Sequence, residues 1–203
     1  MKKIDFKKEL KELYAPSARE AVIVNVPEMN FLMIDGAGHP SAGQEFQNAM
    51  ETLYAVSYTL KFMVEREADS ADYVVMPPEG LWWTGAAGEF DAASTDAWKW
   101  TLMIMQPEFV PGDLFDEAVE QVEKKKNPPA LSKIRFEPFY EGMSVQMMHI
   151  GPYGDEGATI RKLHKFAEER GYVLAGKHHE IYLSDPRRTA PEKLKTIIRY
   201  PVK

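Results

Sequence analysis

The apolar residues of this chain recur with two different periods, and the alternation between them predicts a mixed α+β fold. Over residues 44–65 they recur at steps of three and four, which is the period of an amphipathic helix. The same spacing over 113–126 and 155–170 predicts two further helices. Stretches rich in β-branched and aromatic residues predict strands at 21–26, 29–34, 72–76, 81–84, 98–104, 134–140, 143–150, 178–183 and 195–201.

The order of these elements is repeated along the chain. Strand, bend, strand, helix, strand, strand occurs over about 20–107 and again over about 133–203, and a bridging helix at about 111–127 joins the two halves. This order indicates an internal duplication. If the halves pair about a pseudo-twofold axis, their antiparallel sheets form one concave surface with a central ligand groove and the helices outside. We therefore expect residues 1–203 to form a single domain.

Composition excludes several classes of protein. The net charge of -6 argues against a surface that binds nucleic acid, and the absence of cysteine excludes disulfides, thiolate nucleophiles and Cys-ligated metals. The first ten residues are too charged for a signal peptide, and no apolar run reaches membrane-spanning length. We expect a cytoplasmic protein without a membrane partner, and no protein partner can be inferred. Residues 7–14, ended by Pro16, are interpreted as a short leader.

The segment 178–186 carries the candidate chemistry. Side chains alternate along a strand, so Glu180 and Tyr182 share one face while Ile181 and Leu183 take the other. If the face of Glu180 is open to solvent, this residue is an ordinary surface acid; if the face lines a cavity, Glu180 is the site. Four Trp, nine Tyr and ten Phe, in a chain that also needs an aliphatic core, favour the cavity.

The tryptophans are candidate walls for such a cavity, although each could equally be a core residue. Trp82 and Trp83 must face opposite ways, so only one of them is expected to line a groove. Trp98 and Trp100 share a face.

Other candidates have simpler interpretations beside the functional one. Tyr54 and Tyr58 lie on one flank of the first long helix, where they either line the groove or pack the helix on the sheet. His178 and Glu180 share a strand face, but two ligands without a third make a weak metal site. No Gly-rich phosphate loop precedes either main helix. We expect no metal and no cofactor.

Four motifs together resemble those of the GyrI-like small-molecule-binding proteins, which include the effector-binding domains of multidrug-responsive transcription regulators. The resemblance covers about residues 21–202, and the motifs that carry it are Glu79-Gly80-Leu81-Trp82-Trp83, His149-Ile150-Gly151-Pro152-Tyr153, His178-His179-Glu180-Ile181-Tyr182-Leu183-Ser184-Asp185-Pro186 and Lys195-Thr196-Ile197-Ile198-Arg199. It implies tandem βαββ (SH2-like) units around an aromatic-lined groove, with Glu180 and Tyr153 meeting polar or cationic ligands. The expected ligand-binding residues are Tyr54, Tyr58, Trp83, Trp98, Trp100, Tyr140, Tyr153 and Tyr182, with Glu180 as the catalytic residue.

The resemblance leaves two functions open. The chain has no helix-turn-helix segment and looks closer to a stand-alone, Trp-rich branch whose members hydrolyse the cyclopropane of DNA-alkylating cyclopropanoid toxins inside an aromatic cage. In that case Glu180 orients or deprotonates a water that opens the strained ring, and the cell is protected. The alternative is a non-catalytic protein that sequesters flat aromatic or cationic ligands through cation–π contacts and the same Glu180.

Overall fold

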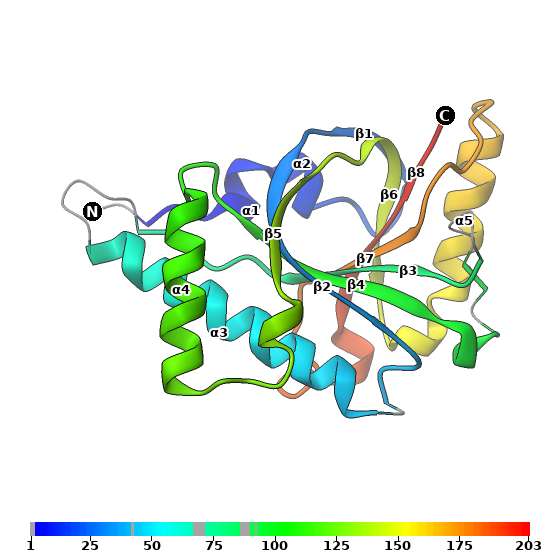
Figure 1. Cartoon of the computed structure of the whole chain (residues 1–203). Coiled ribbons are helices and arrows are strands. Elements are labelled where there is room, and N and C mark those ends of the chain that lie inside the picture. The colour runs from blue at the N-terminus through cyan, green and yellow to red at the C-terminus, as the bar shows by residue number, and fades with distance from the viewer. Residues whose placement is uncertain (1–2, 42, 67–71, 86–89, 92) are drawn as a thin grey trace.

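An eight-stranded sheet organises the computed structural model, which describes residues 3–41, 43–66, 72–85, 90–91 and 93–203. The strand order is β1-β6-β8-β7-β3-β4-β2-β5, and every neighbouring pair is antiparallel. The sheet curls into a half-barrel (Figure 1). Its strands are β1 (Val22–Val26), β2 (Met29–Ala37), β3 (Pro78–Trp83), β4 (Lys99–Gln106), β5 (Arg135–Phe139), β6 (Gly142–Ile150), β7 (His178–Tyr182) and β8 (Lys195–Pro201).

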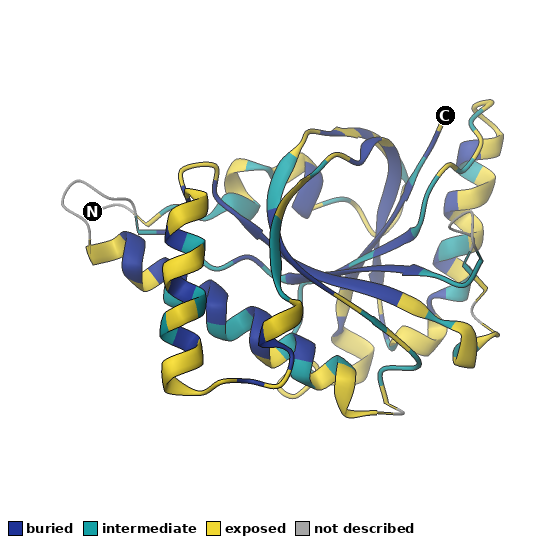
Figure 2. Cartoon of the chain, viewed as in Figure 1, coloured by how far each residue is buried: buried dark blue, intermediate teal, exposed yellow. Residues whose placement is uncertain are grey.

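Helices lie outside the sheet, which confirms the predicted α+β class. They are α1 (Phe6–Glu9), α2 (Lys11–Tyr14), α3 (Gln44–Arg66), α4 (Gly112–Lys125) and α5 (Gly157–Glu168), with short 3-10 turns η1 (Thr95–Ala97), η2 (Leu131–Lys133), η3 (Tyr153–Asp155) and η4 (Pro191–Lys193). α3 packs against β2 and β4, α5 packs against β6 and β8, and α4 packs on α3. The helix faces turned to the sheet are buried (Figure 2). Within the described ranges, no helix is both long and apolar enough to span a membrane.

The strand order has the symmetry expected of two duplicated halves. If β1 is exchanged with β5, β2 with β6, β3 with β7 and β4 with β8, the order reads the same from the opposite edge. β3 and β7 meet at the centre of the sheet, so the strand of Trp82 and Trp83 is the counterpart of the Glu180 strand. The first strand of each half is exchanged: β1 pairs with β6, and β5 pairs with β2. This exchange ties the two halves into one continuous sheet.

The strand predicted at 72–76 is wrong. Among these residues only Tyr73 forms a bridge, to Ile4 in the N-terminal segment, and the central strand begins at Pro78 instead. Proline cannot donate a ladder hydrogen bond, which suits the first position of a strand. Tyr73 and Met76 are still buried, so their apolar character reflects packing against the core.

The interpretation of residues 7–14 as a leader is also wrong. Leu13 and Tyr14, at the end of α2, are 2% and 3% exposed and belong to the main hydrophobic core. The Tyr14 hydroxyl donates to Oε1 of Glu79 on β3 (2.9 Å). The N-terminal helices therefore pack into the fold.

Candidate functional site

The register of the central strands places Glu180 on the face of the sheet that the long helices cover. Gly80 lies opposite Glu180 and Trp82 lies opposite His178, so these side chains share a face. Phe46 of α3 stacks on Trp82 with ring centroids 5.9 Å apart, which identifies this face as the one under α3. The Glu180 side chain is 13% exposed, so it is neither a free surface acid nor sealed from ligands.

His178 holds the Glu180 carboxylate in place. Its Nε2 lies 2.7 Å from Oε1 of Glu180, and its Nδ1 lies 2.7 Å from the hydroxyl of Tyr200. The imidazole is fully buried and stacks on Phe90, with centroids 4.6 Å apart and the planes 8° from parallel. An Nε2–H donating to the carboxylate favours the ionised form of Glu180.

A second carboxyl, Glu156, lies beside Glu180. It immediately precedes α5 and is 5% exposed. Burial, and then the negative charge of Glu180, raise the pKa of Glu156 well above its usual range. Burial by itself would raise the pKa of Glu180 too, but the hydrogen bond from His178 lowers it. One carboxyl of the pair therefore keeps a proton while the other is ionised.

The same three residues could hold a divalent cation. Glu156, His178 and Glu180 each offer one ligand atom, and these atoms lie within 4.8 Å of one another. Oε1 of Glu156 is buried without a hydrogen-bond partner. His178 already contacts the Glu180 carboxylate, and the expectation of no metal stays a prediction. Glu156 was not among the residues expected from the sequence.

Four aromatic residues beside Glu180 form what we call the aromatic wall: Trp82, Trp98, Tyr153 and Tyr182. The Nε1–H of Trp82 donates to the Tyr182 hydroxyl (3.0 Å), and Trp98 meets Trp82 edge to face at 5.5 Å. Tyr153 meets Tyr182 edge to face at 5.8 Å and is 39% exposed. Burial, followed by the charge of Glu180, raises the pKa of Tyr182 well above its ordinary value, so this phenol stays neutral.

Because Gly80 has no side chain, Trp82 and Tyr182 can pack directly over the backbone of β3 at this position. A Cβ at this position would lie 2.7 Å from Nε1 of Trp82 and 2.9 Å from the Tyr182 hydroxyl. We expect Gly80→Ala to destabilise the fold by about 1–3 kcal/mol, because it overpacks this contact. Urea unfolding would measure the loss. Gly154→Ala is the control, since a Cβ there meets nothing within 4 Å; equal stability of the two variants would contradict the expectation.

Trp100 shares the face of the wall but is fully buried, which corrects its expected role as a ligand contact. Its ring packs over Gly36, where a Cβ would overlap the indole, and its Nε1–H donates to the Gly38 carbonyl (3.2 Å). Phe46 meets it edge to face at 5.5 Å. Trp100 therefore supports the wall from beneath.

The two tyrosines of α3 lie side by side, Tyr54 against the core and Tyr58 toward solvent. Tyr54 is half-buried and stacks on Tyr58 at 6.2 Å, and Tyr58 is 47% exposed. Burial raises the pKa of Tyr54 to about 12, with smaller increases from Tyr58 and Asp185 that Arg187 partly offsets. Tyr54 is therefore close to the segment that follows β7. Their role as ligand contacts stays a prediction.

Two of the expected ligand residues are not brought to Glu180. Trp83 points to the opposite face, where Nζ of Lys177 lies 3.4 Å from its ring centroid, because alternation gives the helix-covered face to Trp82. Tyr140 is 63% exposed at the turn between β5 and β6, beside Gly142. Of the two adjacent tryptophans, Trp82 therefore shares the face of Glu180, and a role of Trp83 in ligand binding stays a prediction.

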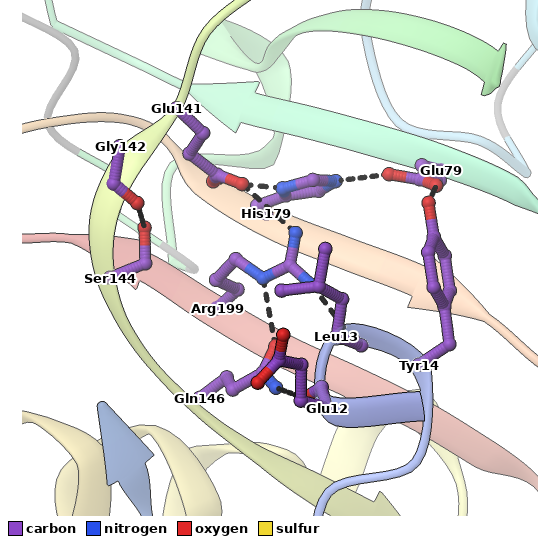
Figure 3. A network of polar contacts seen from close by, with 10 residues as sticks. All are labelled: Glu12, Leu13, Tyr14, Glu79, Glu141, Gly142, Ser144, Gln146, His179 and Arg199. Atoms are coloured by element: carbon purple, nitrogen blue, oxygen red, sulfur yellow. Dashed lines mark hydrogen bonds and ion pairs between the residues drawn. The ribbon is translucent and has the colours of Figure 1, made fainter. Parts of the chain in front are cut away.

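A buried ionic network (Figure 3) lies on the opposite face of the sheet from Glu180, because His179 is the neighbour of Glu180 along β7. His179 is 1% exposed and contacts Oε1 of Glu141 through Nδ1 and Oε2 of Glu79 through Nε2, both at 2.9 Å. Arg199 donates to Oε2 of Glu141 (3.0 Å) and to the Leu13 carbonyl (2.9 Å). The network therefore joins β3, β7 and β8 to the N-terminal helices.

The oppositely charged groups of this network stabilise one another in their ionised forms. Burial by itself would lower the pKa of His179, but Glu141 and then Glu79 raise it to about 9. Burial would raise the pKa of Glu141, but His179 and Arg199 lower it to about 2. His179 is thus an imidazolium at neutral pH, and it fixes the backbone next to Glu180.

Residues 19–203 match the model of a protein family, the GyrI-like small molecule binding domain. The chain belongs to the GyrI-like family. An uncharacterised conserved protein from Listeria innocua is 47% identical over 99% of this chain and 100% of its own, with a TM-score of 0.91. A hydrolase from Listeria innocua is 45% identical over 100% of both chains, with a TM-score of 0.88.

A structure with much lower sequence identity shares the fold. The C-terminal domain of EcmrR has a TM-score of 0.55 at 12% identity, over 91% of this GyrI-like chain and 97% of its own. No curated protein matches the chain.

Proposed function

We propose that this GyrI-like protein binds flat, electrophilic small molecules against the aromatic wall and adds water to them, with Glu180 as the base. The observation that carries this proposal is an ionised carboxylate, 13% exposed, fixed by a buried histidine beside neutral aromatic rings. The similarity to Listeria proteins described as hydrolases supports it. The substrates we propose are cyclopropanoid DNA-alkylating toxins, and the outcome is protection of the cell, with the cytoplasm as the site of action.

The reaction asks little of the protein because ring strain already activates the substrate. Positioning a water beside the cyclopropane and accepting its proton are the two contributions that Glu180 can make. The new C–O bond forms as a ring C–C bond breaks, and the electron pair of that bond ends on the conjugated acceptor of the ligand. That acceptor then takes up one proton, which Glu156 is placed to supply. The sum is addition of one water.

A second candidate is binding without catalysis. The negative charge of Glu180 and the exposed ring of Tyr153 suit an aromatic cation, because cation–π contacts and the carboxylate act together. Such a protein would protect by sequestering its ligand. The two candidates differ in one observable, namely whether the ligand leaves chemically changed.

Product analysis separates them. Purified protein incubated with a neutral cyclopropanoid alkylator is expected to give the ring-opened product that has gained one water, seen by mass spectrometry over many turnovers. Incubation in H₂¹⁸O should place the label in that product, and EDTA should not reduce the rate if no metal takes part. Recovery of unchanged ligand from a stable complex would instead identify a sequestering protein.

A further inference from the structure

A hollow lies on the opposite face of the sheet from Glu180. It has a volume of about 470 Å³, and Trp83 forms part of its lining. Its charged lining residues are the cations Lys99, Lys133, Arg135 and Lys177 and the acids Asp35 and Glu45. The hollow is therefore positively charged on a chain whose net charge is -6.

Both acids in the hollow are already neutralised. Asp35 pairs with Arg135 at 2.9 Å and accepts a hydrogen bond from the Thr101 hydroxyl at 2.6 Å. Glu45 pairs with Lys133 at 2.7 Å. Among the residues that the structure describes, Lys99 and Lys177 pair with no carboxylate. These two ammonium groups are the charges left for a ligand.

Lys177 and Trp83 together form a surface for a flat anion. The Lys177 Nζ lies 3.4 Å from the Trp83 ring centroid, and both residues are half-buried. Burial lowers the pKa of Lys177, and the negative charge of Asp35, which raises it, and the positive charge of Arg135, which lowers it, are smaller influences. Burial removes part of the hydration of the Lys177 ammonium group, and a bound anion would compensate for this loss by accepting its hydrogen bonds.

We propose that this hollow binds a small planar aromatic carboxylate, whose ring packs at the edge of Trp83, because Lys177 covers the ring face, and whose carboxylate pairs with Lys177 and Lys99. A single negative charge fits better than a phosphate, because the guanidinium of Arg135, the group suited to bidentate phosphate contacts, is occupied by Asp35 and by Glu137 (2.9 Å). This site is separate from the proposed hydrolysis and does not depend on it.

The four indole N–H groups provide a direct test, because each tryptophan gives its own cross-peak in a ¹⁵N–¹H spectrum. Assignment of the Trp83 peak follows from its loss in Trp83→Phe. Titration with 2-naphthoate is expected to shift the Trp83 peak and leave those of Trp82 and Trp98 in place. The neutral isostere 2-naphthamide should bind more weakly by roughly fivefold or more, since it lacks the charge that pairs with lysine.

Matched lysine variants test the charge contribution. Lys177→Gln is expected to weaken 2-naphthoate binding by roughly fivefold, whereas Lys162→Gln, which removes the same charge from an exposed position on α5, should leave it unchanged. Three results would overturn the proposal: no shift of the Trp83 peak at millimolar 2-naphthoate, a shift confined to Trp82 and Trp98, or equal affinity for the acid and the amide.

Discussion

Glu180→Gln is expected to lower the turnover of a neutral cyclopropanoid by on the order of a hundredfold or more, because it removes the base and keeps the shape of the site. The amide oxygen can still accept the hydrogen bond from Nε2 of His178, which now lies 2.7 Å from the carboxylate. Affinity for a neutral ligand should therefore change little. Measuring kcat at saturating ligand, and Kd by quenching of tryptophan fluorescence, separates the two quantities.

The control for this variant is Glu168→Gln, which removes an exposed acid at the end of α5. Its turnover should equal that of the wild type. Equal turnover by Glu180→Gln would remove this residue from the mechanism. If Glu180→Gln instead weakened only the binding of cationic ligands, with no turnover to lose in the wild type, the sequestering function would be correct.

Glu141→Gln should destabilise the protein by about 3–5 kcal/mol, which is the second large effect that we expect. The change leaves Arg199 and protonated His179, each 1% exposed, without the carboxylate that both contact. Urea unfolding at neutral pH would measure the free energy of unfolding. Glu120→Gln, which breaks an exposed pair with Lys124, is the control and should change it little.

The same network predicts how stability depends on pH. The folded pKa of His179, about 9, lies above its unfolded value of about 6.5, so its contribution is complete below the unfolded value and is lost as pH rises through about 9. The loss amounts to about 3 kcal/mol. Glu141 acts in the opposite direction: its folded pKa is lowered to about 2, so its contribution is lost as pH falls toward that value.

Replacing the histidine tests this assignment. In His179→Gln the decline of unfolding free energy between mildly acidic pH and about pH 9 should become clearly shallower than in the wild type, because the share of His179 is removed. A decline remains, because the raised pKa of Glu156 also makes folding less favourable as pH rises through this interval. A wild-type protein whose unfolding free energy is flat over that interval would show that His179 is not held as an imidazolium.

Local patterns in the sequence were sufficient for most of the elements and for the alternation that puts Glu180 and Tyr182 on one face of their strand. The strand formers Ile181 and Leu183, followed by the turn at Ser184, placed β7 and the alternation of its side chains. The repeated order of elements led to the antiparallel sheet with helices outside. These properties depend on neighbours along the chain, which sequence patterns report directly.

What the sequence did not reveal depends on contacts between distant segments. The choice between Trp82 and Trp83 is set by the register of β3 against β7, which alternation alone leaves open. Glu156 lies 24 positions before Glu180, and only the packing of α5 on the sheet brings the two together. Its position just after the 149–153 motif, at the start of a helix, was the available signal. The exchange of β1 and β5 between halves likewise has no local signature.

The proton that Glu156 holds beside ionised Glu180 is the feature on which the proposed chemistry depends most. Infrared difference spectroscopy can detect it, because a protonated carboxyl absorbs apart from a carboxylate. At neutral pH, and still at mildly alkaline pH, the wild type should show a protonated carboxyl band that is lost in Glu156→Gln and kept in Glu168→Gln. A neutral-pH spectrum without that band would contradict the carboxyl pair.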